Sequence, residues 1–257
     1  MNTASSRISM TGQRGKRGLA VRPLVTVNRT MTVLQPVKVI LTNVPKDFCE
    51  ELSCNDFPKD PSRGNHKVHL TKEIWVDQND VMLNNEQFWH RIAPGQTVGL
   101  KYAHAITVEK IITDDKGVSV VYAKLHNTEK KKAKAYLHWI SETDSVTCEV
   151  RIYDHLFSAY NPMKLSNFLD GLNPNSCTTH YSCKMNKNLL SRTFSYWFSN
   201  AYLGLKNEDK VQFERLGFFV VDKDTDVDGG RFVWNLTVRL SDKALRQAKS
   251  KKPAPKN

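Results

Sequence analysis

Three polar residues, Gln212, Glu214 and Arg215, stand between aromatic and branched apolar residues in the segment Val211–Phe219. An acidic run and then a second apolar run, residues 231–240, follow this segment. The pattern predicts a β-hairpin whose first strand carries Gln212 and Arg215. Glutamine amides and arginine guanidinium groups are side chains that read base edges and bind phosphates. On the residues alone, both could equally be solvated side chains on the outer face of a strand.

The net charge of the chain is the second informative feature. Its 257 residues carry a formal net charge of +12, and much of the excess lies at the two ends. No acidic residue precedes Asp47, and residues 243–257 contain six lysines or arginines and no acid. Such an excess favours a polyanionic partner, most often RNA or DNA, although a merely basic protein stays open. A membrane surface fits less well, because the basic segments have no interleaved apolar face.

Residues 1–28 show no hydrophobic periodicity and are rich in Ser, Thr and Arg. They could form an arm that binds phosphates, a mitochondrial transit peptide or an unstructured solubilising arm, and composition does not separate these readings. The transit-like composition slightly favours the mitochondrial matrix over the cytoplasm. The five cysteines are odd in number and follow no secretory signal, so we expect free thiols in a reducing compartment.

The apolar runs between residues 32 and 240 are short, close together and rich in β-branched and aromatic residues. This pattern predicts a mainly all-β protein with a few short helices, one of them over residues 165–172. The length suits two small β-barrels better than one.

Two patterns resemble metal sites, but neither is complete. Cys177, His180 and Cys183 could bind zinc only if Cys148 supplied a fourth ligand, and ordinary buried thiols are the simpler interpretation. Residues 224–229 match the first half of a calcium-binding EF-hand loop, but they lack its bidentate glutamate and its flanking helices. A hairpin turn explains them better, and we expect neither a metal nor another cofactor.

Several segments in chain order resemble the C-terminal anticodon-binding domain of glutaminyl-tRNA synthetase. They are residues 28–38, 73–77, 138–141, 149–157, 212–219 and 234–238. Because several independent motifs occur in the correct order over roughly residues 29–242, the resemblance is specific. It implies two antiparallel β-barrels that together grip an anticodon loop, whose unstacked bases expose their edges. The family's barrel is also similar to that of a bacterial ribosomal protein that binds 5S rRNA.

By position, the resemblance implies RNA contacts by seven residues: Arg29, Lys59, Arg91, Lys101, Gln212, Glu214 and Arg215. Lys101 replaces the family's usual arginine, which keeps the charge but loses the planar fork that reads a base. Lys59 stands where an asparagine is expected, and this favours phosphate contact. We expect Glu214 to orient Arg215 or Arg29 through a charge-assisted hydrogen bond. The large aromatic residues are expected in the core: Trp75, Trp139, Phe213 and Trp234.

The expected organisation is a basic arm or transit peptide at 1–28, a first barrel at 29–140, a second barrel with a crossing segment at 141–242, and a basic tail at 243–257. The chain leaves no room for the nucleotide-binding α/β domain of a class I synthetase, so we expect no enzyme activity from it alone. We expect a non-catalytic protein that binds a tRNA anticodon loop or a similar structured RNA. Two alternatives are a structural component of a mitochondrial ribosome that binds rRNA and a fragment of an active glutamine–tRNA ligase. Ribosomal proteins or a synthetase catalytic subunit would then be protein partners.

Overall fold

The computed structural model describes residues 27–57, 60, 62, 64–83, 91–115, 117–126, 133, 135–191 and 209–240. Strands dominate these residues and form two seven-stranded sheets and a separate two-stranded sheet. The helices are short: η3 (Gln78–Asp80), η4 (Pro162–Lys164), η5 (Phe168–Gly171) and α2 (Asn188–Ser191). The predicted all-β class is therefore confirmed.

No helix in the described ranges is both long enough and apolar enough to cross a lipid bilayer.

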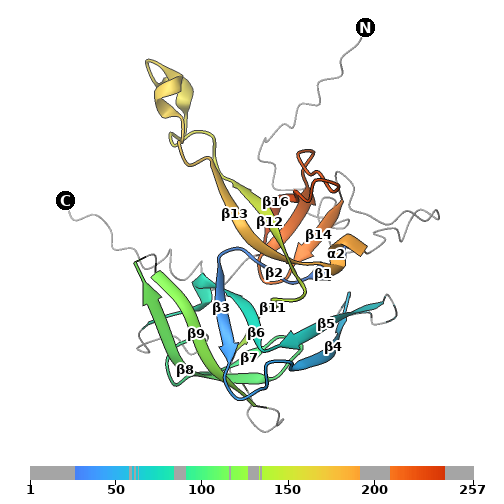
Figure 1. Cartoon of the computed structure of the whole chain (residues 1–257). Coiled ribbons are helices and arrows are strands. Elements are labelled where there is room, and N and C mark those ends of the chain that lie inside the picture. Colours follow the sequence, from blue (N-terminus) through green and yellow to red (C-terminus); the bar gives the residue numbers. More distant parts are fainter. Residues whose placement is uncertain are drawn as a thin grey trace.

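The first lobe is built on one curled sheet with the strand order β10-β7-β8-β9-β3-β6-β11 (Figure 1). Residues alternate between buried and half-buried along β3, because successive side chains of a strand point to opposite faces. Its strands are β3 (Pro36–Leu41), β6 (Glu73–Asp77), β7 (Thr97–Leu100), β8 (Ala105–Asp114), β9 (Gly117–His126), β10 (Tyr136–Leu137) and β11 (Ile140–Ser141). A hairpin of β4 (Cys49–Asn55) and β5 (Asn65–Thr71) extends from this lobe.

The second lobe is built on the other seven-stranded sheet, with the order β1-β14-β15-β16-β12-β13-β2. Its strands are β1 (Arg29–Thr30), β2 (Thr32–Val33), β12 (Ser145–Tyr153), β13 (Cys177–Asn186), β14 (Lys210–Phe213), β15 (Gly217–Val221) and β16 (Val233–Arg239). Figure 1 shows β12 and β13 projecting from this lobe as a long ribbon.

Both sheets curl by the same device. In each sheet the two edge strands are neighbours along the chain: β1 and β2 are separated by Met31, and β10 and β11 by His138 and Trp139. One short segment therefore pairs with both edges of its sheet, which leaves fewer unpaired strand edges. Pairing is mainly antiparallel, as predicted, but β1–β14, β7–β10, β12–β16 and β3–β9 are parallel.

The sheets do not follow the expected division at residues 140 and 141 in every respect. Residues 29–33, which we placed in the first barrel, pair with β14 and β13 of the second sheet. The chain thus begins its described part in the second lobe, builds the first lobe and returns. Division by chain order misses this, because an edge strand can come from a segment distant in sequence.

Each lobe has its own hydrophobic core. Trp139 lies in the first core, and Phe213 and Trp234 lie in the second, where their ring centroids are 5.2 Å apart. Those three predictions are confirmed. Trp75 differs, because it is only half-buried and the ammonium groups of Lys38 and Lys184 lie 5.0 and 5.4 Å from its ring centroid.

The helix predicted over residues 165–172 is wrong in type and extent. The structure has two 3₁₀ turns, η4 and η5, at the tip of the β12–β13 ribbon. Asn167 caps η5 by accepting a hydrogen bond from the Leu169 backbone N–H, and Leu172 is already extended. So short a segment does not recover the free energy of nucleating an α-helix.

Candidate nucleic-acid interface

The predicted single strand over Val211–Phe219 is in fact two strands joined by a tight turn. β14 and β15 form a hairpin in which Gln212 lies opposite Phe218 and Phe213 opposite Gly217. Glu214, Arg215 and Leu216 make the turn. The prediction failed because the turn has none of the usual glycine, asparagine or proline signals. Arg215 itself adopts the left-handed conformation, with φ of 66°.

The Arg215 side chain leaves the second lobe and binds two residues of the first. Its Nη1 and Nη2 donate to the two carboxylate oxygens of Asp80, at 2.6 and 2.8 Å. Its Nη1 also lies 2.9 Å from Nδ1 of His138. Asp80 ends η3, and His138 stands between β10 and β11. A bidentate guanidinium–carboxylate pair is among the strongest and most directional polar contacts in proteins.

His138 is buried, and its protonation follows from its surroundings. Burial, together with the positive charge of Arg215, lowers the pKa of His138 below its ordinary value, while Asp80, Asp77 and Glu214 act in the opposite direction. A neutral imidazole can accept the Arg215 hydrogen bond at Nδ1 and carry its proton on Nε2. The Nε2 atom is buried and has no hydrogen-bond partner among the described residues.

Glu214 binds the first lobe beside Arg215. The Tyr102 hydroxyl donates to Glu214 Oε1 at 2.7 Å, and the Lys101 ammonium forms an ion pair with Oε2. Burial and the Glu214 carboxylate raise the pKa of Tyr102. We expected Glu214 to orient Arg215 or Arg29; the described contacts instead join it to Lys101 and Tyr102, and Asp80 orients Arg215.

Arg29 lies directly beside Gln212. The two residues are register partners on the parallel strands β1 and β14, and the Gln212 backbone N–H donates to the Asn28 carbonyl at 2.9 Å. The Arg29 backbone N–H donates to the Asp56 carbonyl, next to β4, at 3.3 Å, so Arg29 also lies where the two lobes meet. Gln212 is largely buried. The backbones of Arg29 and Gln212 are therefore held in a fixed relative position by two hydrogen-bonded strands.

The two remaining predicted residues have different outcomes. Arg91 is exposed, and it precedes Ile92, whose backbone N–H donates to the Asp80 carbonyl at 2.7 Å. Arg91 therefore precedes a residue whose backbone is bonded to that of Asp80. Lys59 lies outside the described residues.

The structure thus brings Arg29, Lys101, Gln212, Glu214 and Arg215 to one junction between the lobes, with Arg91 at its flank. Three further residues at this junction were not predicted from the sequence: Asp80, Tyr102 and His138. His138 begins the segment 138–141, which resembles the family, but no role was assigned to it. Asp80 and Tyr102 carried no local signal, because their partners lie in the other lobe and far along the chain.

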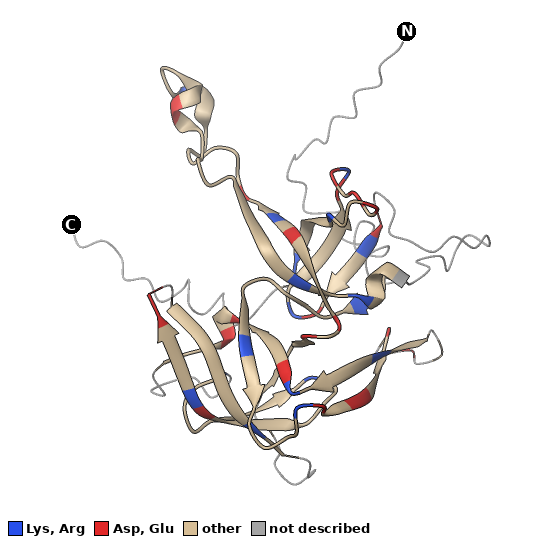
Figure 2. Ribbon diagram, viewed as in Figure 1, with Lys and Arg blue, Asp and Glu red and all other residues tan. Residues whose placement is uncertain are grey.

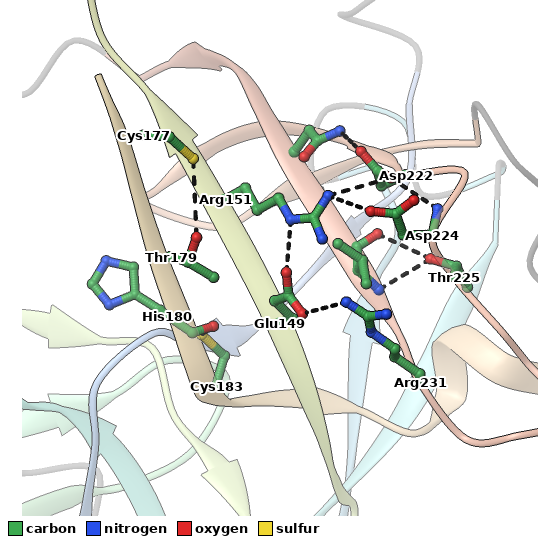
Figure 3. Close-up of polar contacts among 12 residues, drawn as sticks. Glu149, Arg151, Cys177, Thr179, His180, Cys183, Asp222, Asp224, Thr225 and Arg231 are labelled. Atoms are coloured by element: carbon green, nitrogen blue, oxygen red, sulfur yellow. Dashed lines mark hydrogen bonds and ion pairs between the residues drawn. The ribbon is translucent and has the colours of Figure 1, made fainter. Parts of the chain in front are cut away.

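The cysteine and histidine pattern does not converge on a zinc ion. Cys177 and Cys183 are six residues apart on β13, and a strand rises ~3.3 Å per residue, so they are separated by about 20 Å. Figure 3 shows Cys177 and Cys183 at separate places along β13. Cys177 is exposed, whereas Cys183 is buried and is the register partner of Cys148 on β12. Within the described ranges, no three His, Cys, Asp or Glu side chains are placed to hold a metal ion.

The calcium-like run is a hairpin turn, as predicted. Asp226 and Arg231 form an isolated β-bridge, and the Gly229 N–H donates to the Asp226 carboxylate at 2.9 Å. Asp224 is engaged elsewhere, because it accepts a 2.7 Å hydrogen bond from Arg151 (Figure 3). The Asp224 and Asp226 carboxylates therefore stabilise the second lobe through these hydrogen bonds.

Comparison with known families decides the relationship. Two family models match the chain, both described as the anti-codon binding domain of tRNA synthetases class I (E and Q), over residues 27–127 and 136–222. The chain belongs to this anticodon-binding domain family. The two matches meet near β10, where the first sheet closes.

Curated relatives of this anticodon-binding domain are glutamine–tRNA ligases. The chain is 34% identical over 221 residues to a probable glutamine–tRNA ligase of Dictyostelium discoideum, which covers 83% of the chain and 26% of that protein. It is 33% identical to the cytoplasmic glutamine–tRNA ligase of Arabidopsis thaliana, covering 84% of the chain and 27% of that protein. The chain is 36% identical to the glutamine–tRNA ligase of Ralstonia pickettii, and this match covers 83% of the chain and 36% of that protein. The chain therefore spans about a quarter to a third of these relatives, and the matches detect only their anticodon-binding domain.

Proposed function

We propose that this anticodon-binding domain holds the anticodon loop of a tRNA at the junction between its two lobes. The observation that carries the proposal is the convergence of Arg29 and Gln212 from the second sheet with Lys101 from the first. Sequence-specific RNA recognition targets unpaired loop bases, whose edges are free to form hydrogen bonds. A junction that offers amide, guanidinium and ammonium groups from two lobes suits such a loop.

The residues have different chemistry for this task. Arg29 and Gln212 carry the planar groups that can bind a base edge at two points, so we assign base reading to them. Lys101 and Lys59 are assigned to phosphates, because a lysine ammonium acts as a point charge without a planar fork. Arg91, exposed at the flank of the junction, is also assigned to a phosphate, which a guanidinium group binds through charge-assisted hydrogen bonds. Glu214 holds Lys101 and Tyr102 in place, and Arg215 completes the junction.

The distribution of charge supports separate roles for the basic segments and for the junction. The described residues hold 18 of the 38 lysines and arginines and 22 of the 26 aspartates and glutamates, a formal net charge of −4 against +12 for the chain. Figure 2 shows both signs interspersed over the two lobes. Long-range attraction to a polyanion must therefore come mainly from the basic segments outside the described ranges. The junction contributes selection among loops.

Glutamine tRNA is the proposed ligand, because the curated relatives are glutamine–tRNA ligases. Charging of that tRNA would belong to a whole ligase. A structural role in a ribosome finds no support among these relatives, and the mitochondrial location stays a prediction.

Purification of this protein with its bound RNA from its native source, followed by RNA sequencing, tests the proposal. We expect tRNA in a small complex, with glutamine tRNA enriched over other tRNAs. Co-sedimentation with a large ribosomal subunit and recovery of rRNA would overturn the proposal. An even distribution over all tRNAs would contradict loop selection.

A further inference from the structure

We infer that Asp80, with its partner Arg215, is a positioning element for RNA binding: the pair fixes the second lobe's half of the site against the first lobe's half. This inference rests on the proposed function. It concerns Asp80, whose negative charge repels RNA. No pattern in the sequence indicates that Asp80 has a role in the site. We call the contacts of Glu214 and Arg215 with Asp80, Lys101, Tyr102 and His138 the clasp.

The clasp consists of two neighbouring side chains that bind two different places on the first lobe. Glu214 binds Lys101 and Tyr102 immediately after β7, whereas Arg215 binds Asp80 after β6 and His138 after β10. Two attachment points side by side resist rotation of one lobe about the other, which a single contact would allow. The Glu214 backbone N–H also donates to Thr30, at 2.9 Å, so the turn is fixed to β1.

The clasp lies where both sheets close. His138 belongs to the segment that joins the edges of the first sheet, and Arg29 begins the segment that joins the edges of the second. Gln212 is only two residues from Glu214, on the strand that leads into the turn. A shift of the turn would therefore move Gln212 and Arg29 relative to Lys101. Base hydrogen bonds require donor and acceptor distances near 2.7–3.2 Å, so a small shift would lose them.

The contacts of Asp80 indicate that it acts on Arg215 and not on RNA. Both of its carboxylate oxygens accept hydrogen bonds from the Arg215 guanidinium group. A carboxylate at the surface of a polyanion site weakens binding through repulsion. If Asp80 had no positioning role, its neutralisation would leave RNA affinity unchanged or increase it. The positioning role predicts the opposite sign.

The test measures the dissociation constant of the full chain for a glutamine tRNA anticodon stem–loop, over a range of salt concentrations, with Asp80→Asn. We expect a roughly tenfold weaker affinity, the change that ~1.4 kcal/mol produces. Asp224→Asn is the matched control: it removes an aspartate from another Asp–Arg pair, with Arg151 in the second lobe, and should leave the affinity within about twofold. Unchanged or tighter binding by Asp80→Asn would overturn the inference.

Arg215→Lys provides a second variant that keeps the charge but cannot form the bidentate pair. We expect the same roughly tenfold loss. The slope of log affinity against log salt should stay unchanged, because it reports the number of phosphates neutralised. Full affinity of Arg215→Lys would mean that the bidentate fork is not needed and would overturn the inference. Thermal unfolding of each variant shows whether it is folded at the assay temperature. If Asp80→Asn is unfolded at that temperature, the affinity of Arg215→Lys decides whether the inference holds.

Failure of the proposed function has a different signature. If the unaltered protein does not bind tRNA at all, the function proposal fails and this inference fails with it. If the unaltered protein binds and Asp80→Asn binds equally well, only the inference fails.

Discussion

Arg29 and Gln212 are register partners on two parallel strands that come from opposite ends of the described chain. Parallel pairing fixes their backbones side by side, and the hydrogen bond from Gln212 N–H to the Asn28 carbonyl, at 2.9 Å, holds the register. The side chains proposed to read bases are thus placed by the sheet that forms the lobe, and not by a loop. The proposed recognition of RNA and the folding of the second lobe therefore depend on the same strand pair.

This pairing predicts that Gln212 and Arg29 act together on base selection. Gln212→Ala should reduce the preference for the correct loop over a loop with one changed base by about 1–3 kcal/mol, the value of a bidentate base contact. Arg29→Ala should reduce the same preference, and the double variant should lose less than the sum, because neighbouring sites are coupled. Competition binding with stem–loops that differ at single loop positions measures these preferences. Equal losses for every loop would mean that the two residues contact the backbone only.

Tyr102 should contribute to stability through Glu214. Tyr102→Phe removes the hydroxyl that donates to a buried carboxylate at 2.7 Å and leaves Lys101 as the partner of Glu214 in the clasp. We expect the free energy of unfolding to fall by about 1–3 kcal/mol, the usual range for a hydrogen bond to a charged group. Urea denaturation followed by fluorescence measures it, and Tyr153→Phe, at an exposed tyrosine on the β12–β13 ribbon, is the control.

His138 should make stability depend on pH in the weakly acidic range. Its pKa is lowered in the folded protein, mainly by burial, so the unfolded chain binds the proton more tightly. The contribution of neutral His138 is therefore fully present above its unfolded pKa, near 6.5, and is lost as the pH falls toward the lower folded value. Stability measured by denaturation between pH 7.5 and about 5 should fall less in His138→Asn, which keeps an acceptor for Arg215 but does not titrate. The same fall in both proteins would assign the effect to other groups.

The basic N-terminal segment should supply affinity without selectivity. Deletion of residues 1–26 removes five arginines and lysines and no acid, and leaves Asn28 and β1 in place. Affinity should fall by a similar factor for all RNAs, and the salt slope should become shallower, because fewer counterions are released on binding. A change in the order of preference among loops would instead show that the segment contacts bases.

Some of the fold could be predicted from the sequence. Short, closely spaced runs rich in β-branched and aromatic residues indicated a mainly β protein, and Trp139, Phe213 and Trp234 could be assigned to the core because large aromatic residues between branched ones are usually buried. The turn at Glu214–Leu216 could not, since no local turn signal marks it and Arg215 adopts its unusual φ under tertiary contacts. Pairing of β1 with β14 is equally hidden, because a two-residue strand has almost no pattern of its own.

The residues of the candidate site likewise include some that could be predicted from the sequence and some that could not. Resemblance to a family indicated Arg29, Lys101, Gln212, Glu214 and Arg215, which the structure brings to one junction. It did not indicate which side chains bind one another, and Asp80 and Tyr102 remained unrecognised. Partners that meet across two lobes leave no spacing in the sequence by which to find them.

Selection of an anticodon loop by the lobe junction can be measured directly. Fluorescence anisotropy at physiological salt, with the unaltered full chain, compares a glutamine tRNA anticodon stem–loop with the same stem carrying an unrelated loop sequence. We expect the glutamine loop to bind at least about tenfold more tightly, since one wrong base costs ~1–3 kcal/mol. Equal affinity for the two loops, with a steep salt dependence for both, would contradict it and would leave an RNA-binding protein that responds to phosphate charge alone.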